Sequence, residues 1–298
     1  MDVLITGFKG FVGSNLINYL GNKTAYGIDL RTDWLNQINR NDKFSIIHLA
    51  GKAHDLKKTS VPEEYYQVNF ELTKKLYDAF LKSTANKFIF VSSVKAVADT
   101  VDGMLTEDHI PNPITDYGKS KLLAEQYIQS QPLPQGKAYY ILRPCMIHGP
   151  GNKGNLNLLY QFVQKGVPYP LAAFENKRSF LSVENLSFVI SNLLSKEIPS
   201  GIYNVSDDKA LSTNEVVEIL ANSLNKRAKL WRVSPSLIRG TAKVGDVLKL
   251  PLNTERLNKL TENYIVSNQK LKNTLGVEFP ISTAEGLLIT AKSFSLQS

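Results

Sequence analysis

Three glycines placed three residues apart near the N-terminus constrain the fold of this chain more than any other feature of its sequence. Gly7, Gly10 and Gly13 lie in the stretch T-G-F-K-G-F-V-G, directly after an apolar run at residues 2–6 and where a helical pattern begins. Such a turn lets backbone N–H groups approach a pyrophosphate, and the helix N-terminus adds a favourable dipole and unsatisfied donors. A glycine-rich turn can also simply join a strand to a helix, but its position here predicts dinucleotide binding.

Short apolar runs alternate with helical patterns through the first half of the chain. The apolar runs, rich in β-branched and aromatic residues, are 2–6, 25–29, 44–49, 87–93 and 138–143. Apolar residues recur at helical spacing over 12–20, 62–84, 116–130 and 155–165. This alternation predicts an α/β fold of the Rossmann type, a doubly wound parallel sheet with helices on both faces.

The pattern of the sequence changes after residue 150, where prolines and glycines interrupt the chain and short helical patterns are joined by brief strands. Two of these later helical patterns cover 212–225 and 282–294. We expect a dinucleotide-binding domain over 1–150 and a smaller C-terminal α/β lobe over 151–298. The lobe is expected to bind mainly the substrate, and a return of the chain to the core sheet is left open.

Charge and cysteine content exclude several classes of function. The net charge is +8, but the lysines are interpreted as scattered along the chain and do not interleave with aromatic residues, so no nucleic acid partner is expected. Cys145 is the only cysteine, which rules out an intramolecular disulfide and a cysteine-based metal cluster, and no metal is expected. With no apolar run of eighteen residues and no signal sequence, we expect a cytoplasmic protein without a membrane partner.

Two charged residues after the second apolar run bear on the choice of dinucleotide. Asp29 ends that run, where a carboxylate can accept both hydroxyls of the adenosine ribose and would repel a 2′-phosphate. Arg31, two residues later, can instead partner a phosphate or remain a solvated surface charge. The expected cofactor is therefore NAD, in preference to NADP.

A tyrosine, a lysine and a serine pair form the candidate catalytic group. Tyr117 and Lys121 are four residues apart in a helical pattern, so their side chains share one face. An ammonium group and an oxidised nicotinamide would stabilise the phenolate and make Tyr117 a usable acid and base. Ser92 and Ser93 end the fourth apolar run, at the sheet edge where α/β proteins bind ligands, so a hydroxyl there can hydrogen-bond the reacting oxygen.

Taken together, these motifs resemble the extended short-chain dehydrogenase/reductase superfamily, also called the NAD-dependent epimerase/dehydratase family, over nearly the whole chain. The matching pieces are T-G-F-K-G-F-V-G, H-L-A-G at 48–51, Asn69, S-S at 92–93, Tyr117 with Lys121, and R-P-C-M-I-H-G-P at 143–150. By this resemblance Ser93 orients the substrate, Tyr117 is the acid and base, and Lys121 lowers the tyrosine pKa and holds the nicotinamide ribose. Asn69 is expected to be mainly structural.

The resemblance and the glycine turn together define the expected binding residues. Those for the cofactor are Gly7, Gly10, Phe11, Val12, Gly13, Asp29, Arg31, Leu49, Ala50, Gly51, Tyr117, Lys121 and Pro144. Arg178 matches the arginine with which UDP-sugar epimerases grip the diphosphate, a role that suits a bidentate donor of fixed charge. The expected substrate-binding residues are Ser93, Lys95, Asn155, Arg178 and Arg256.

Two departures from the family pattern bear on the reaction. The stretch from Asp29 to Phe44 is too short for the usual helix and extra strand, so the element that commonly contacts adenine is trimmed. Met146 stands where sugar 4-epimerases carry an asparagine. The motifs S-S-V-K, R-P-x-x-x-x-G-P, K-G-N and R-S-F-L-S-V-E-N-L look more like a bacterial subgroup that includes 4-keto reductases making UDP-N-acetylquinovosamine-type sugars.

The resemblance therefore implies an enzyme that performs redox chemistry at C4 of a UDP-hexose or UDP-N-acetylhexosamine. The resemblance favours a 4-keto reductase, and a UDP-sugar 4-epimerase (UDP-glucose or UDP-N-acetylglucosamine) is the alternative. A 4,6-dehydratase is disfavoured because Val94 and Lys95, rather than an acidic pair, follow Ser93. A non-catalytic NAD(P)-binding regulator is a distant alternative, and a scaffold would need none of these polar groups.

The family also suggests a second copy of the chain as a partner. Its members commonly form homodimers through helices equivalent to 62–84 and 116–130, which pair as a four-helix bundle. Tyr65, Tyr66, Leu76 and Phe80 are the expected contacts. A homodimer in polysaccharide biosynthesis is therefore the expectation for the whole molecule.

Overall fold

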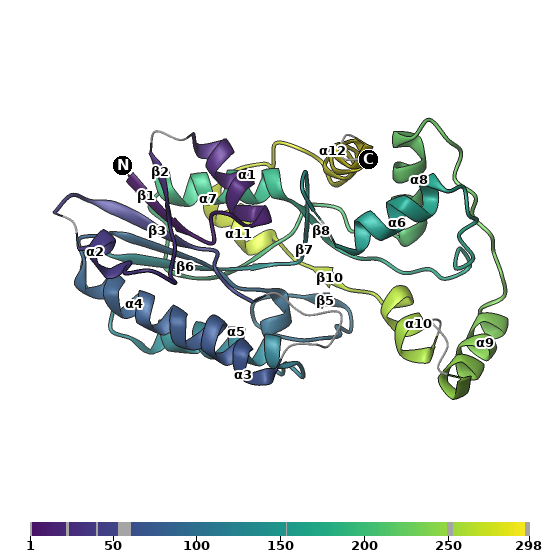
Figure 1. Ribbon diagram of the computed structural model, residues 1–298, viewed down its shortest axis with the longest axis horizontal. Helices are drawn as coiled ribbons and strands as arrows, with labels where there is room; N and C mark the ends of the chain where they lie inside the picture. Colours follow the sequence, from purple (N-terminus) through teal and green to yellow (C-terminus); the bar gives the residue numbers. More distant parts are fainter. Residues whose placement is uncertain are drawn as a thin grey trace.

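The computed structural model of the protein describes residues 2–21, 24–39, 41–52, 61–152, 154–248 and 253–295. Six strands form one parallel sheet in the order β2-β1-β3-β4-β6-β9 (Figure 1). The strands are β1 (Asp2–Thr6), β2 (Ala25–Ile28), β3 (Phe44–His48), β4 (Lys87–Val91), β6 (Ala138–Pro144) and β9 (Gly201–Val205). The Rossmann-type fold predicted from the alternating pattern is therefore confirmed. The strand order changes direction between β1 and β3, the place where such sheets bind ligands.

Helices cover both faces of this sheet (Figure 1). One layer contains α1 (Phe11–Leu20), α7 (Val183–Ser195) and α11 (Gln269–Leu275). The other contains α3 (Pro62–Tyr65), the π-helical turn η1 (Tyr66–Glu71), α4 (Leu72–Lys82) and α5 (Asp116–Ser130). The pattern over 62–84 thus corresponds to three consecutive helical segments, α3, η1 and α4, rather than one regular helix.

The core follows from the alternation of side chains along each strand. Neighbouring residues of β1, β3 and β4 point to opposite faces, because side chains in a strand alternate with a period of two. Ile5, Ile47 and Ile89 belong to the cluster beneath α1 and α7. Leu4, Ile46 and Phe88 belong to the cluster beneath α4 and α5. Near-continuous apolar runs are what a sheet buried on both faces requires.

The C-terminal lobe has its own apolar cluster and is connected to the sheet more than once. Its elements are β7 (Met146–His148), α6 (Asn155–Gln164), β8 (Phe180–Ser182), α8 (Thr213–Ser223), α9 (Pro235–Leu248), α10 (Thr254–Thr261) and α12 (Thr283–Ser295). A small parallel pair, β5 (Met104–Leu105) with β10 (Ile265–Val266), lies between the two parts. Through β9 the chain returns to the core sheet, the arrangement that the sequence left open.

Two further expectations are decided by the fold. Only α2 (Leu35–Ile38), about one helical turn, lies between β2 and β3 in the described part of the chain, which agrees with a trimmed adenine-side element. The proposed dimer contacts are wrong for Leu76 and Phe80, because both side chains are completely buried within the chain's own core. Among the described helices, none combines the length and apolar character needed to cross a membrane.

Candidate active site

The glycine turn between β1 and α1 is closed by contacts that leave no room for side chains. Gly7 has a φ of +68°, and a Cβ atom on it would lie 2.7 Å from the backbone nitrogen of Ala50. A Cβ atom on Gly13 would lie 2.4 Å from the carbonyl oxygen of Gly7. Gly10 begins α1 without a side-chain cap. The turn therefore presents backbone donors and a helix N-terminus, as a pyrophosphate site requires.

The ends of β1 and β3 are joined by a buried histidine that sequence analysis did not assign. His48 lies between the hydroxyls of Thr6, 2.7 Å from Nδ1, and Thr73, 2.8 Å from Nε2. Thr6 also accepts a hydrogen bond from the backbone N–H of Ala50 at 3.1 Å. Burial lowers the pKa of His48 to about 3, so the ring is neutral at physiological pH. The hydrogen bond between Ala50 and Thr6 therefore holds the 49–51 segment against the glycine turn.

The two charged residues beyond β2 pair with each other. Arg31 donates from Nε to one oxygen of the Asp29 carboxylate at 2.9 Å and from Nη2 to the other at 2.7 Å. These hydrogen bonds hold the pKa of Asp29 well below its usual range, so the carboxylate stays ionised. Arg31 lies at the surface and Asp29 is partly exposed, and the carboxylate has acceptor capacity beyond these two hydrogen bonds.

The structure brings the three candidate catalytic residues to the carboxyl edge of the sheet. Ser93 follows β4 and caps the 3-10 turn η2 (Val94–Ala96), and its hydroxyl hydrogen-bonds the Tyr117 side chain. Burial raises the pKa of Tyr117, although this hydrogen bond opposes the rise. Lys121 donates to the carbonyl oxygen of Val91 at 3.1 Å, and burial lowers its pKa to about 8. The ammonium is therefore held at the end of β4, beside Ser92 and Ser93.

Close packing of the start of α5 sets the position of Tyr117. Thr115 caps the helix by accepting the N–H of Gly118 at 3.2 Å, and the Asp99 carboxylate accepts the N–H of Thr115, also at 3.2 Å. A Cβ atom on Gly118 would lie 2.4 Å from the carbonyl oxygen of Lys95. Only glycine therefore lets the helix approach the turn after Ser93.

A buried ion pair connects the elements that carry the candidate catalytic residues. Glu125, one helical turn beyond Lys121 on α5, pairs with Arg143 of β6 at 2.6 Å, and both side chains are almost completely buried. The Ser92 hydroxyl donates to the same carboxylate. The pair therefore ties α5, β4 and β6 together directly behind Ser93.

Asn69 is completely buried and connects Lys52 to α5, and its mainly structural role stays a prediction. Its side chain accepts the backbone N–H of Lys52 at 2.7 Å and donates to the Ser120 hydroxyl at 3.1 Å. A Cβ atom on Gly51 would lie 3.0 Å from the Asn69 amide oxygen and 3.1 Å from Lys121 Nζ. The 49–51 segment thus packs directly over the lysine, which brings the two sets of candidate cofactor residues together.

Two of the candidate substrate-binding cations lie near Tyr264. Lys95 donates to the carbonyl oxygen of Asp99 at 2.7 Å, and its ammonium lies 4.1 Å from the centre of the Tyr264 ring. Burial lowers the pKa of Lys95, although the carboxylates of Asp99 and Glu262 oppose this fall. Arg178 pairs with Glu262 at 2.9 Å. These residues form a charged region next to Ser93.

The remaining candidates lie on other elements. Pro144 is buried at the end of β6. Asn155 begins α6 and Arg256 lies on α10, and both are exposed. No group of three or more histidine, cysteine, aspartate or glutamate residues is placed to hold a metal ion in the part of the chain that the structure describes. The site therefore centres on Ser93, Tyr117 and Lys121.

Comparison with known proteins places this geometry in a family. The sequence profile of the NAD dependent epimerase/dehydratase family matches residues 3–206, and the chain is 31% identical to a UDP-glucose 4-epimerase from Vibrio cholerae, over 98% of this chain and 95% of that protein. The chain belongs to this epimerase/dehydratase family. It is also 25% identical to a GDP-6-deoxy-D-mannose reductase from Pseudomonas aeruginosa, over 74% of this chain and 79% of that protein. The structure of MoeE5 in complex with UDP-glucuronic acid and NAD has a TM-score of 0.77 at 21% identity, covering 100% of both chains.

Membership of the epimerase/dehydratase family confirms two predictions made from the sequence. The family is NAD-dependent, so the cofactor is NAD, as the glycine motif and Asp29 together predicted. The tight approach of Gly7 and Gly13 to neighbouring backbone atoms is what a turn that admits a pyrophosphate requires. The chain is therefore an enzyme of the nucleotide-sugar epimerase/dehydratase family.

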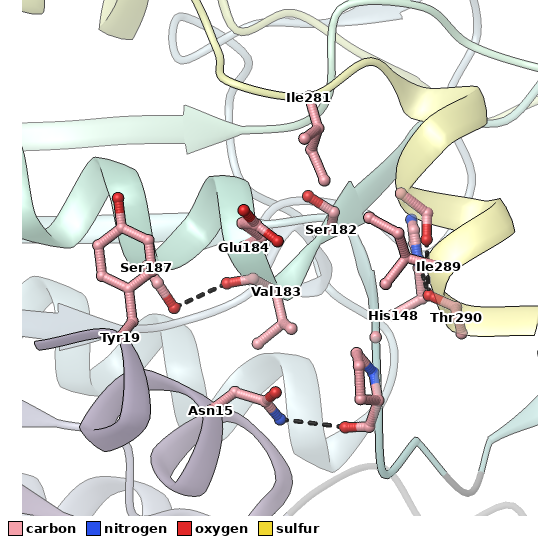
Figure 2. A pocket seen from close by; sticks show the side chains of 13 residues that line it. Asn15, Tyr19, His148, Ser182, Val183, Glu184, Ser187, Ile281, Ile289 and Thr290 are labelled. Atoms are coloured by element: carbon pink, nitrogen blue, oxygen red, sulfur yellow. Dashed lines mark hydrogen bonds between the residues drawn. The ribbon is translucent and has the colours of Figure 1, made fainter. Parts of the chain in front are cut away.

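A separate cavity of about 230 Å³ lies on the α1 face of this family fold, between α1, the start of α7 and α12. Asn15, labelled in Figure 2, donates to the carbonyl oxygen of Pro150 at 3.1 Å, which joins α1 to the R-P-C-M-I-H-G-P segment. His148 hydrogen-bonds Thr290 of α12 at 2.9 Å. None of Ser93, Tyr117 and Lys121 lines this cavity, so it is distinct from the catalytic group.

Proposed function

We propose that the enzyme exchanges hydride between NAD and C4 of a UDP-linked hexose or N-acetylhexosamine. The observation that carries this proposal is the hydrogen bond between Ser93 and Tyr117 at the sheet edge, beside the buried ammonium of Lys121. A hydroxyl donor next to an ionisable phenol is the arrangement needed to move a proton on and off a sugar oxygen. When bound, NAD supplies the hydride acceptor and, once reduced, the donor.

The chain's own residues handle the proton. In the oxidation direction, the Tyr117 phenolate takes the proton of the C4 hydroxyl as the hydride leaves C4, so the C4–O bond becomes a carbonyl. Ser93 donates a hydrogen bond to the same oxygen, and Lys121 stabilises the phenolate through its positive charge. In the reverse direction, Tyr117 returns the proton to O4. We assign the diphosphate of the substrate to Arg178, released from Glu262, and Lys95.

We place the 4-epimerase first among the two reactions of this kind. The full-length similarity to a UDP-glucose 4-epimerase favours it over the reductase to which the sequence motifs leaned. An epimerase oxidises and reduces the same carbon, so no net reductant is consumed. The 4-keto reductase remains the second candidate, favoured by the similarity to a GDP-6-deoxy-D-mannose reductase and by Lys95 two residues after Ser93.

Proton NMR of the purified enzyme with NAD and, separately, UDP-glucose and UDP-N-acetylglucosamine distinguishes these reactions. Appearance of the C4 epimer without added reductant is the expected result. Unchanged spectra would favour the reductase, which is then tested with a 4-keto-6-deoxy UDP-sugar and NAD(P)H. Absence of turnover in both assays, with NAD bound, would contradict the proposed C4 chemistry.

The Tyr117→Phe variant tests the assignment of the acid and base. Turnover is expected to fall by about two to four orders of magnitude, because a phenyl ring cannot accept or return the proton. Binding of NAD, followed by fluorescence, should persist. Tyr19→Phe, on the helix α1 and partly exposed, is the matched control and should keep normal turnover. Retained turnover in Tyr117→Phe would remove this tyrosine from the mechanism.

A further inference from the structure

Positive charge in this chain is concentrated in one stretch of the C-terminal lobe. Residues 226–261 contain nine lysines and arginines and two acidic residues, so they carry seven of the eight net positive charges of the whole chain. Eight of these cations lie in the described part of the stretch, and all eight are exposed: Lys226, Arg227, Lys229, Arg232, Arg239, Lys243, Arg256 and Lys259. The scattered distribution assumed from the sequence is therefore incorrect for this region.

The same stretch exposes large apolar side chains. On α9, Leu237, Val244 and Leu248 are separated by seven and four residues, so they share one side of the helix, and they are 61%, 53% and 63% exposed. Ile238 and Ala242 lie on a different side and are buried. With Val247, Trp231 and Leu260, these three side chains form what we call the α9 surface.

Cations border the α9 surface along its length. Lys243 lies one helical turn before Val247 on α9, and Arg232 is adjacent to Trp231. Lys259, which pairs with Glu255 at 2.8 Å, is adjacent to Leu260. Figure 1 places α9 and α10 at one end of the molecule, far from β2 and with no other element beyond them. An apolar stripe bordered by lysine and arginine at the end of a molecule is the composition of an interfacial membrane-binding surface.

We propose that the α9 surface binds the face of an anionic lipid bilayer, with its apolar side chains among the headgroups and its cations against the lipid phosphates. Cations near such a surface strengthen binding electrostatically, and a peripheral contact of this kind needs no spanning helix. A nucleic acid would match the cations but leave the aliphatic side chains without a role, because base stacking needs aromatic platforms. Trp231 is the one aromatic residue of the α9 surface.

The proposed contact would lie next to the substrate side of the enzyme. Glu262 directly follows α10 and pairs with Arg178, and Lys259 is close enough to influence the pKa of Lys95. The α9 surface and the charged region around Tyr264 therefore belong to neighbouring parts of the lobe. The proposal itself is independent of which sugar the enzyme uses, since it rests only on exposed side chains and charge.

Vesicle flotation of the full chain tests the proposal. We expect at least tenfold more protein on vesicles of phosphatidylcholine with about one third phosphatidylglycerol than on phosphatidylcholine alone, and release in high salt. The Leu237→Ser/Val247→Ser double variant should lose at least fivefold of this binding. The matched control is Ile110→Ser/Ile114→Ser, which changes side chains that are 89% and 71% exposed outside the α9 surface, and it should bind as the unchanged protein does.

Several outcomes would overturn the proposal. Equal binding to both kinds of vesicle, or no loss in Leu237→Ser/Val247→Ser, would mean that the α9 surface does not contact lipid. A fall in molar mass by light scattering in that double variant would assign the α9 surface to a contact between two copies of the chain. Tighter binding to duplex DNA than to anionic vesicles, unaffected by the apolar substitutions, would assign the cations to nucleic acid instead.

Discussion

Lys121 is buried, and the proposed proton transfer by Tyr117 needs the positive charge of its ammonium group. Burial lowers its pKa to about 8, so its ammonium is present below that pH and is lost above it. Lys121→Met removes this charge and raises the pKa of Tyr117 further, so the acidic limb of the kcat/KM profile for UDP-sugar oxidation should move upward by at least about one pH unit. Lys119→Met, exposed on the same helix, is the control, and an unmoved limb in Lys121→Met would contradict the assigned role.

The buried pair of Glu125 and Arg143 makes a prediction about stability. Glu125→Gln leaves the guanidinium of Arg143 without its carboxylate in a site where both side chains are at most 2% exposed. Loss of one buried partner costs about 3–5 kcal/mol in the free energy of unfolding, which corresponds to a fall of roughly 10 °C in Tm. Glu218→Gln, exposed on α8, should change Tm by little, and similar values for the two variants in calorimetry would refute this account.

At the residue scale, the sequence could predict which side chains come together where local spacing decides it, while their roles stay a proposal. Tyr117 and Lys121 are four apart on one helix, and Ser93 ends a recognisable strand. The supporting residues could not be predicted, because their partners are distant in the sequence. His48 meets Thr6 across 42 residues, and Arg143 meets Glu125 between two elements whose register only the fold defines.

At the element scale, the glycine turn makes a prediction with a matched control. Gly13→Ala places a methyl group 2.4 Å from the carbonyl oxygen of Gly7, so α1 must shift and the Kd for NAD should rise at least about tenfold. Gly240→Ala on α9 meets no atom within 4 Å and should raise the free energy of unfolding by about 0.5–1 kcal/mol. Equal NAD affinity of the two variants, measured by calorimetric titration, would show that the turn does not contact the dinucleotide.

The elements themselves were predictable where periodicity extends over a whole strand or helix. The five predicted strands correspond to β1, β2, β3, β4 and β6, because strands buried on both faces are nearly continuous apolar runs. The π-helical turn η1 was not predictable, since its apolar pattern is that of an ordinary helix. A count over the whole chain hides the local excess of positive charge in residues 226–261, and the exposure of the apolar side chains on α9 depends on packing.

At the scale of the whole molecule, the path of the chain predicts one cooperative unfolding transition. The chain belongs to the lobe cluster over 156–180, returns to the sheet over 181–205, and enters the lobe again over 211–257. Because the chain passes between the sheet and the lobe several times, unfolding of either part would disrupt segments that belong to the other. NAD at a hundred times its Kd adds about 2.7 kcal/mol to the free energy of unfolding, so a single calorimetric peak should move upward by roughly 5–10 °C. Two peaks, of which NAD moves only one, would mean that the lobe unfolds independently of the sheet.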